Sequence, residues 1–149
     1  MNFYLDSSAL VKLYIDEVGS DRIKEIVFSE KNNVFISKIT GAEVAAAFSR
    51  RRLMKDIAEE DYDEILSDFL SDFVSLFAKS EVTDSVVFLA IELTKRRVLR
   101  GYDAVQLASA LTLSAEINGS VIFVSADIDL NGMAKDEGLA VEDLDIRAK

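Results

Sequence analysis

The sequence predicts an α/β domain with a central, mostly parallel β-sheet, and two observations lead to this fold class. Short apolar runs rich in β-branched and aromatic residues end in small or acidic residues, as strands buried on both faces of a parallel sheet do. Amphipathic helical patterns lie between these runs, and this alternation is typical of a parallel sheet covered by helices. Clear strands are expected at residues 2–5, 34–36 and 121–124. Weaker ones are expected at Glu81-Val82 and at residues 139–141.

Apolar residues at helical spacing mark the segments between the strands. The stripes are Leu10, Leu13, Tyr14; Ile23, Ile26, Val27; Val44, Ala47, Phe48; Ile65, Phe69, Phe73, Leu76, Phe77; Val87, Ala90, Ile91, Thr94; and Val105, Ala108, Leu111, Ala115. The longest stripe lies on an otherwise acidic helix, and we interpret its phenylalanines as core rather than as a dedicated site.

Length and composition indicate one domain over residues 1–149, because 149 residues are enough to bury a core and no repeat or linker divides them. The chain has no cysteine, which excludes disulfides and thiolate metal sites and favours a reducing cytoplasm. It has no histidine either. A bound metal must therefore take oxygen ligands, which favours Mg²⁺ or Mn²⁺ over zinc.

The net charge of −10 counts against a passive nucleic-acid binder, because it repels phosphate backbones at long range. It counts less against a nuclease, since metal ions would offset acids gathered in one site. The first residues lack the pattern of a signal peptide. No apolar run reaches the roughly 18 residues of a membrane span. We therefore expect a cytoplasmic protein with no membrane association.

Four acidic residues follow predicted strands or begin predicted helices, and they are the main candidates for chemistry. They are Asp6, Glu43, Asp103 and Asp127. Because the carboxyl ends of parallel strands meet at one edge of the sheet, we expect these carboxylates to gather there. Carboxylates held close together repel one another unless a cation joins them. The combination predicts a Mg²⁺ or Mn²⁺ site, with Asp129 as a weaker fifth candidate.

Each of the four acids also has a purely structural interpretation. Asp6, Asp103 and Asp127 each precede a helical pattern and are suited to cap the helix. Thr40 followed by Glu43 matches a capping box, in which the glutamate reaches back to the cap amide. Taken one at a time, the four residues leave both interpretations open.

The segments around these acids carry a more specific pattern. Residues 3–14 read Phe-Tyr-Leu-Asp-Ser-Ser-Ala-Leu-Val-Lys-Leu-Tyr, and residues 99–110 read Leu-Arg-Gly-Tyr-Asp-Ala-Val-Gln-Leu-Ala-Ser-Ala. Residues 124–127 read Val-Ser-Ala-Asp, and Ala42-Glu43-Val44 lies between the first two segments. In this order they resemble the acidic motifs of PIN domains, particularly toxins of the VapC type. The resemblance spans nearly the whole chain, and the two long segments are its specific part.

The resemblance implies a three-layer α/β/α sandwich around the sheet and metal-dependent cleavage of RNA. It makes the four acids, Asp6, Glu43, Asp103 and Asp127, both the catalytic and the metal-binding residues. Ser7 would be a hydroxyl neighbour that bonds a ligand water or carboxylate, and Asp129 an outer acid. Gln106 stands where many relatives have histidine, so the family's role for that side chain is not carried over. The expected reaction is in-line attack of a metal-activated water on a phosphodiester.

The resemblance also implies partners. VapC-like proteins usually act as the toxin of a toxin–antitoxin pair and are inhibited by a small antitoxin protein, and relatives commonly form homodimers. RNA would be the substrate. Antitoxins often insert a basic side chain into the acidic site, and the charge of −10 suits a basic peptide by electrostatic complementarity.

Two basic clusters stand out in this acidic chain, Arg50–Arg52 with Lys55 and Lys95–Arg97 with Arg100. Each lies at the C-terminal end of a predicted helix, where cations offset the helix dipole. The other interpretation is that Arg51, Arg97 and Arg100 contact RNA phosphates on either side of the cut. The sequence favours neither.

Two other functional classes share some of these features. An aspartyl-phosphate enzyme or a receiver-like domain also has an aspartate after the first strand. A haloacid-dehalogenase-like phosphatase needs a second acid two residues later, where this chain has Ser8, and the receiver pattern is not evident. A PIN-shaped binding module without catalysis is the second alternative. Phosphate transfer to Asp6 would identify the first class, and failure to bind Mn²⁺ would identify the second.

Overall fold

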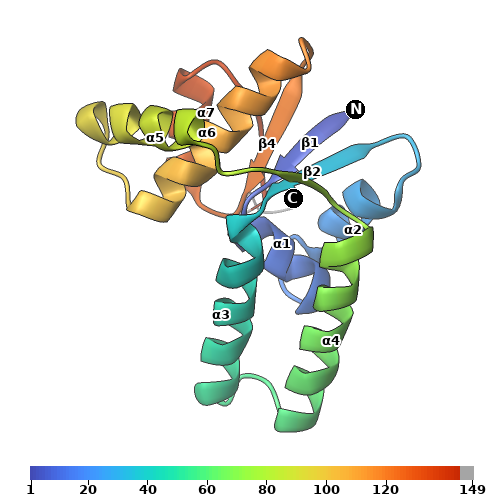
Figure 1. Ribbon diagram of the computed structural model, residues 1–149. Helices are drawn as coiled ribbons and strands as arrows, with labels where there is room; N and C mark the ends of the chain where they lie inside the picture. Colours follow the sequence, from blue (N-terminus) through green and yellow to red (C-terminus); the bar gives the residue numbers. More distant parts are fainter. Residues whose placement is uncertain (145–149) are drawn as a thin grey trace.

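The computed structural model describes residues 1–144 and is built on a parallel five-stranded sheet (Figure 1). The strands are β1 (Asn2–Leu5), β2 (Asn33–Ser37), β3 (Ala78–Ser80), β4 (Val121–Ser125) and β5 (Ala140–Asp143). Their order in the sheet is β3-β2-β1-β4-β5, and every neighbouring pair is parallel. β1 is therefore the central strand, and Phe3 lies between Val34 of β2 and Ile122 of β4.

Helices connect the strands and cover both faces of the sheet. They are α1 (Ser7–Tyr14), α2 (Ser20–Phe28), α3 (Ile39–Leu53), α4 (Glu59–Ser75), α5 (Asp84–Arg96), α6 (Gly101–Glu116) and α7 (Ile128–Asp136). The predicted three-layer sandwich around a parallel sheet is confirmed. Within residues 1–144, no helix combines the length and the apolar character that a bilayer span requires.

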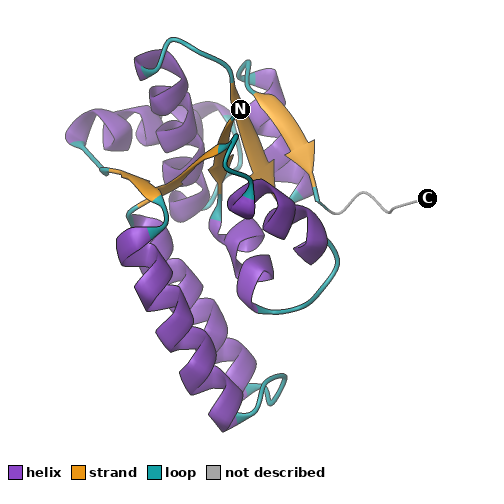
Figure 2. Cartoon of the chain, turned by 90° about the vertical axis from the view of Figure 1, so that its right-hand side faces the viewer, coloured by secondary structure: helices purple, strands orange, loops and turns teal. Residues whose placement is uncertain are grey.

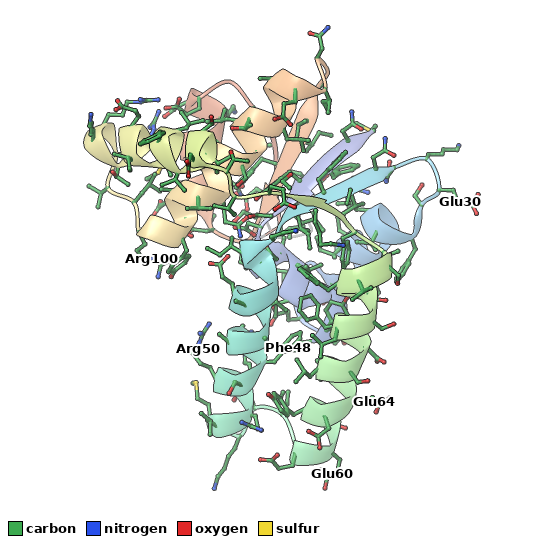
Figure 3. All side chains as sticks on the ribbon, in the orientation of Figure 1. Glu30, Phe48, Arg50, Glu60, Glu64 and Arg100 are labelled. Atoms are coloured by element: carbon green, nitrogen blue, oxygen red, sulfur yellow. The ribbon has the colours of Figure 1, made fainter. Side chains whose placement is uncertain are left out.

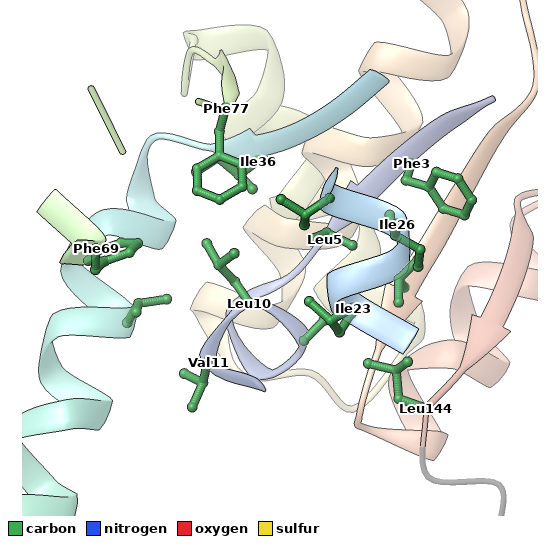
Figure 4. Close-up of a cluster of buried hydrophobic side chains, with 14 of the residues drawn as sticks. Phe3, Leu5, Leu10, Val11, Ile23, Ile26, Ile36, Phe69, Phe77 and Leu144 are labelled. Carbon is green, nitrogen blue, oxygen red and sulfur yellow. The ribbon is translucent and has the colours of Figure 1, made fainter. Parts of the chain in front are cut away.

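Alternate residues of β1 face two separate cores, as the period of a β-strand requires. Phe3 and Leu5 are buried with helices α1 to α4, and Figure 4 shows this core. Tyr4 points to the other face and is buried with helices α5 to α7. The central strand β1 thus contacts both layers of helices.

Helices α3 and α4 run side by side and project away from the sheet, as Figures 1 and 2 show from two directions. Aromatic side chains hold the pair together, and the rings of Phe48 and Phe69 meet edge to face with centroids 5.8 Å apart. Tyr14 of α1 packs on both rings and ties the helix pair to the first helix.

Two sequence predictions are wrong at the end of α4. The helix ends at Ser75, so Leu76 and Phe77 of the predicted stripe lie beyond it; Leu76 is exposed, whereas the side chain of Phe77 is still buried. The strand expected at Glu81-Val82 is instead Ala78–Ser80. Within the described part of the chain this edge strand pairs only with β2, and its Ala-Lys-Ser sequence lacks the apolar residues of a strand covered on both faces.

Candidate active site

Acidic side chains from four separate segments line one cavity of about 580 Å³. They are the four predicted acids, Asp6, Glu43, Asp103 and Asp127. The cavity lies at the carboxyl edge of the sheet, because Asp6 directly follows β1 and Asp127 lies just beyond β4. The rest of its polar lining comes from Ser7, Ser8, Arg50, Arg100, Tyr102 and Gln106.

Asp6 is the most deeply buried of the four acids, with 4% of its surface exposed. It caps α1 by accepting a hydrogen bond from the Ala9 amide at 2.9 Å. Ser8 Oγ donates to its Oδ1 at 2.7 Å, and Ser125 Oγ donates to its Oδ2 at 2.5 Å. Burial raises the pKa of Asp6 to about 6, the Asp103 charge adds to the increase, and these hydrogen bonds oppose it. The helix-cap prediction for Asp6 is confirmed, and the same residue also lines the cavity.

Glu43 is half-buried in α3 and is held through one of its two oxygens. Ser7 Oγ and Gln106 Nε2 each donate to its Oε1 at 2.7 Å. Oε2 accepts no hydrogen bond from any residue between 1 and 144. The capping box predicted for Thr40 and Glu43 is wrong, because α3 begins at Ile39 without a side-chain cap and Thr40 lies inside the helix.

Asp103 lies in the first turn of α6 and forms an ion pair with Arg100, whose Nε donates to its Oδ2 at 3.1 Å. Burial raises the pKa of Asp103 and the charge of Asp127 adds to the increase, while the Arg100 ion pair opposes it. The helix-cap interpretation of Asp103 is wrong, because Arg100 occupies the cap position. Arg100 itself is at the N-terminal end of α6, so its predicted place at the C-terminal end of a helix is also wrong.

Asp127 caps α7, where its Oδ1 accepts hydrogen bonds from the amides of Asp129 at 3.0 Å and Leu130 at 3.1 Å. Ser125 Oγ, which donates to Asp6, accepts from the Asp127 amide at 3.0 Å and so connects these two acids. Asp129 is exposed and is not part of the cavity lining. Its contact with Asp127 is the hydrogen bond that its backbone amide donates.

Ser8, Ser125 and Gln106 are the polar neighbours whose roles sequence reasoning missed. Serines beside Asp6 and before Asp127 are visible in the sequence, but nothing there shows that their hydroxyl groups share one carboxylate. Gln106 is 1% exposed on the inner face of α6, and in the sequence it is indistinguishable from a polar residue on a helix surface.

Two of the three predicted RNA-contacting arginines lie away from the acids and are paired within the protein. Arg51 forms an ion pair with Glu17 at 3.0 Å. Arg97 forms one with Glu137 at 2.8 Å. Neither side chain is part of the lining of the acidic cavity.

Arg100 and Arg50 do line that cavity, and Figure 3 shows them projecting on the same side of the molecule from different elements. Arg50 is exposed in the last turn of α3 and has no ion-pair partner among the described residues. The Arg100 guanidinium lies 4.9 Å from the ring centre of Tyr102. Positive charge thus borders the acids on the exposed side of the cavity.

The donor set of the cavity suits a hard divalent cation, because every acidic ligand candidate offers carboxylate oxygen. Among residues 1–144, no three acidic side chains gather closely enough to hold one ion together. Magnesium usually takes only one or two carboxylates and keeps several waters, so it does not require such a cluster. Burial is the main cause of the raised pKa of Asp6, and it also raises the pKa of Asp103 despite the ion pair with Arg100.

A family model described as PIN domain matches residues 3–136. The chain belongs to the PIN-domain family. The matched range contains all four acids of the cavity. Ribonuclease VapC45 of Mycobacterium tuberculosis (strain CDC 1551 / Oshkosh) is 33% identical over 113 residues, which cover 74% of this chain and 75% of that relative.

Solved structures of Mycobacterium tuberculosis proteins share this PIN fold. VapC20, described as a sarcin–ricin loop cleaving toxin, has a TM-score of 0.64 at 17% identity, over 93% of this chain and 96% of its own. VapBC-5, a member of the VapBC family of toxin–antitoxin systems, has a TM-score of 0.56 at 18% identity, over 96% of this chain and 97% of its own. At these identities the likeness concerns the fold.

Proposed function

We propose that this PIN-domain protein is a divalent-metal-dependent ribonuclease whose active site is the acidic cavity. The observation that carries the proposal is that four carboxylates from separate segments line one cavity at the carboxyl edge of the sheet. The relative named Ribonuclease VapC45 supports RNA as the substrate class. Mg²⁺ or Mn²⁺ is the proposed cofactor, since the chain has neither cysteine nor histidine to favour a softer metal.

One or two of the four acids would bind the ion directly, and the others would bind the waters that it keeps. Asp6 and Glu43 are fixed by hydrogen bonds from neutral side chains, so their oxygens keep their places before a ligand arrives. Asp103 and Asp127 each have one oxygen without a hydrogen bond from residues 1–144 and can take an ion or a water. When bound, the ion would supply a water of lowered pKa and a positive charge opposite the phosphate.

The arginines at the mouth of the cavity would bind the RNA backbone. Arg50 and Arg100 border the acids from two elements, so phosphates on both sides of the cut would meet a guanidinium group. The exposed ring of Tyr102 beside Arg100 offers a surface on which an unpaired base can stack. Arg51 and Arg97, paired with acids of the protein, are weaker candidates for this role.

Protein partners complete the proposal. A small antitoxin protein would inhibit the nuclease, and the structural similarity to VapBC-5 supports this pairing. A homodimer is the proposed assembly, supported by the exposed apolar side chains Phe88 and Ile91 on one face of α5. A cysteine-free chain suits the reducing cytoplasm, where RNA substrates are available.

The deciding experiment is to incubate the purified protein with cellular RNA and Mg²⁺ or Mn²⁺ and to sequence the new 5′ ends. Cleavage at defined positions that is lost with a chelator and in Asp6→Asn supports the proposal. A protein that neither binds Mn²⁺ nor cleaves RNA would instead identify a PIN-shaped binding module. A phosphorylated Asp6 after treatment with a small phosphodonor would identify an aspartyl-phosphate enzyme.

A further inference from the structure

Gln106 is a buried polar residue that the proposed chemistry does not use, and four hydrogen bonds surround its amide. Its Oε1 accepts from the Tyr4 hydroxyl at 2.6 Å. Its Nε2 donates to Glu43 Oε1 at 2.7 Å, to Thr40 Oγ1 at 2.9 Å and to Ser7 Oγ at 3.2 Å. Since an amide nitrogen has two hydrogens, the long contact to Ser7 shares one of them.

The charges around the amide allow one orientation. The Tyr4 hydroxyl is fully buried and lies 2.6 Å from the amide oxygen, to which it donates. In the flipped orientation the amide oxygen would face the carboxylate of Glu43, and two acceptors would repel each other. The NH₂ group must therefore point toward Glu43.

The amide connects elements from both layers of the sandwich. Tyr4 belongs to the central strand, Gln106 to α6 on one face and Glu43 to α3 on the other. The hydrogen bond from Gln106 holds Oε1 of Glu43, a residue that lines the cavity, while Oε2 has no partner among residues 1–144. One oxygen is thus fixed to the fold and the other is left for a ligand.

We infer that Gln106 is a positioning residue that orients Glu43 for cation binding across the two layers, an inference that rests on the proposed metal-dependent nuclease. Its neutral amide can donate a hydrogen bond to a metal-binding carboxylate without adding a charge that competes with the cation. Groups that orient a ligand in this way commonly change metal affinity about 10- to 100-fold when they are lost.

The alternative is that Gln106 only satisfies the buried hydroxyl of Tyr4. A pair of variants separates these roles. Tyr4→Phe removes the hydroxyl and keeps the bond from Gln106 to Glu43, whereas Gln106→Met in the Tyr4→Phe background removes that bond and leaves no tyrosine hydroxyl unsatisfied. The Mn²⁺ dissociation constant without RNA, the melting temperature, and kcat and KM for RNA cleavage are measured for both variants and the wild type.

Tyr4→Phe should lower the melting temperature, because the amide oxygen loses its donor, and should keep wild-type Mn²⁺ affinity. The double variant should bind Mn²⁺ about 10- to 100-fold more weakly and lose kcat rather than RNA affinity. A double variant with wild-type Mn²⁺ affinity would overturn the role of Gln106 and leave the nuclease proposal standing. A wild-type protein that neither binds Mn²⁺ nor cleaves RNA would overturn both.

Discussion

The acidic cavity has a floor and a rim that are held in different ways. The floor consists of Asp6 and Glu43, whose oxygens accept hydrogen bonds from neutral serine, amide and backbone groups. The rim consists of Asp103 and Arg100, joined by an ion pair in which the Arg100 side chain is 67% exposed. Solvent screens such a pair, so it stabilises little and reorganises easily. The floor therefore sets the geometry of the site, and the rim adapts to what enters it.

The largest effect should come from the floor. Asp6→Asn keeps the shape of the side chain but removes its negative charge, so RNA cleavage should fall by at least about a hundredfold, beyond the usual loss from a supporting residue. Asp21→Asn is the matched control, because it makes the same change on the exposed face of α2. Initial rates under saturating Mn²⁺ measure both, and equal rates for the two variants would remove Asp6 from the active site.

The floor should also make the metal-free protein sensitive to pH. Folded Asp6 holds its proton up to about pH 6, while the unfolded chain releases it near 3.8. Its contribution therefore lowers the free energy of unfolding as pH rises from about 4 to 6 and stays constant above that. The difference corresponds to about 3 kcal/mol.

Urea unfolding of the wild type and Asp6→Asn in chelator measures this contribution as the difference between two pH profiles. The difference isolates Asp6 from the other acids, including Glu137, whose pKa is lowered by its ion pairs with Arg96 and Arg97. Profiles that stay parallel from pH 4 to 7 would show that Asp6 is not a carboxylate with a raised pKa.

Metal binding should test the floor and the rim together, because acids of both regions are expected to contribute to it. At a Mn²⁺ concentration of 100 times the dissociation constant, the folded state should gain about 2.7 kcal/mol, which calorimetry detects as a higher melting temperature. Asp103→Asn should remove most of that gain and stabilise the metal-free protein slightly, because one charge beside Asp127 disappears. An undiminished gain in Asp103→Asn would confine metal binding to the floor.

The smallest effect concerns the arginines near the rim. Arg50→Ala should weaken RNA binding and reduce the slope of log affinity against log salt by about 0.7 on single-stranded RNA. Arg51→Ala is the matched control, since Arg51 lies next to Arg50 but is paired with Glu17 and lies outside the cavity lining. It should leave the slope unchanged and cost about 0.3–1 kcal/mol as a helix-end charge. Equal slopes for both variants would remove Arg50 from the RNA-binding surface.

The sequence predicted the sheet and the gathering of acids better than it predicted how those acids are held. Asp6 and Asp127 follow strong apolar strands, so their place at the sheet edge could be inferred from the chain alone. Their cap role and their place in the cavity are compatible, because one oxygen can accept from a helix amide while the carboxylate faces a ligand. Helix capping and ligand binding were therefore not true alternatives at these positions.

Contacts between distant segments could not be predicted. The partners of Gln106 lie 99 residues away in Ser7 and 63 away in Glu43, and no local pattern encodes such pairs. The same holds for Arg51, whose pairing with Glu17 depends on how α3 packs beside the first helix. Local spacing placed the arginines on helix ends but could not distinguish Arg50, which lines the cavity, from its neighbour.

Helix α3 fixes the distance between Glu43 and Arg50, which both line the cavity. Glu43 and Arg50 are seven residues apart on one helix, a separation of about 10 Å along its axis at roughly 1.5 Å per residue. The tip of the α3–α4 pair lies beyond Arg50, and its residues 54–56 are exposed. Insertions and deletions are best tolerated at such exposed tips. The tip can therefore change length in evolution, or in an engineered variant, while the distance from the acidic floor to Arg50 stays fixed.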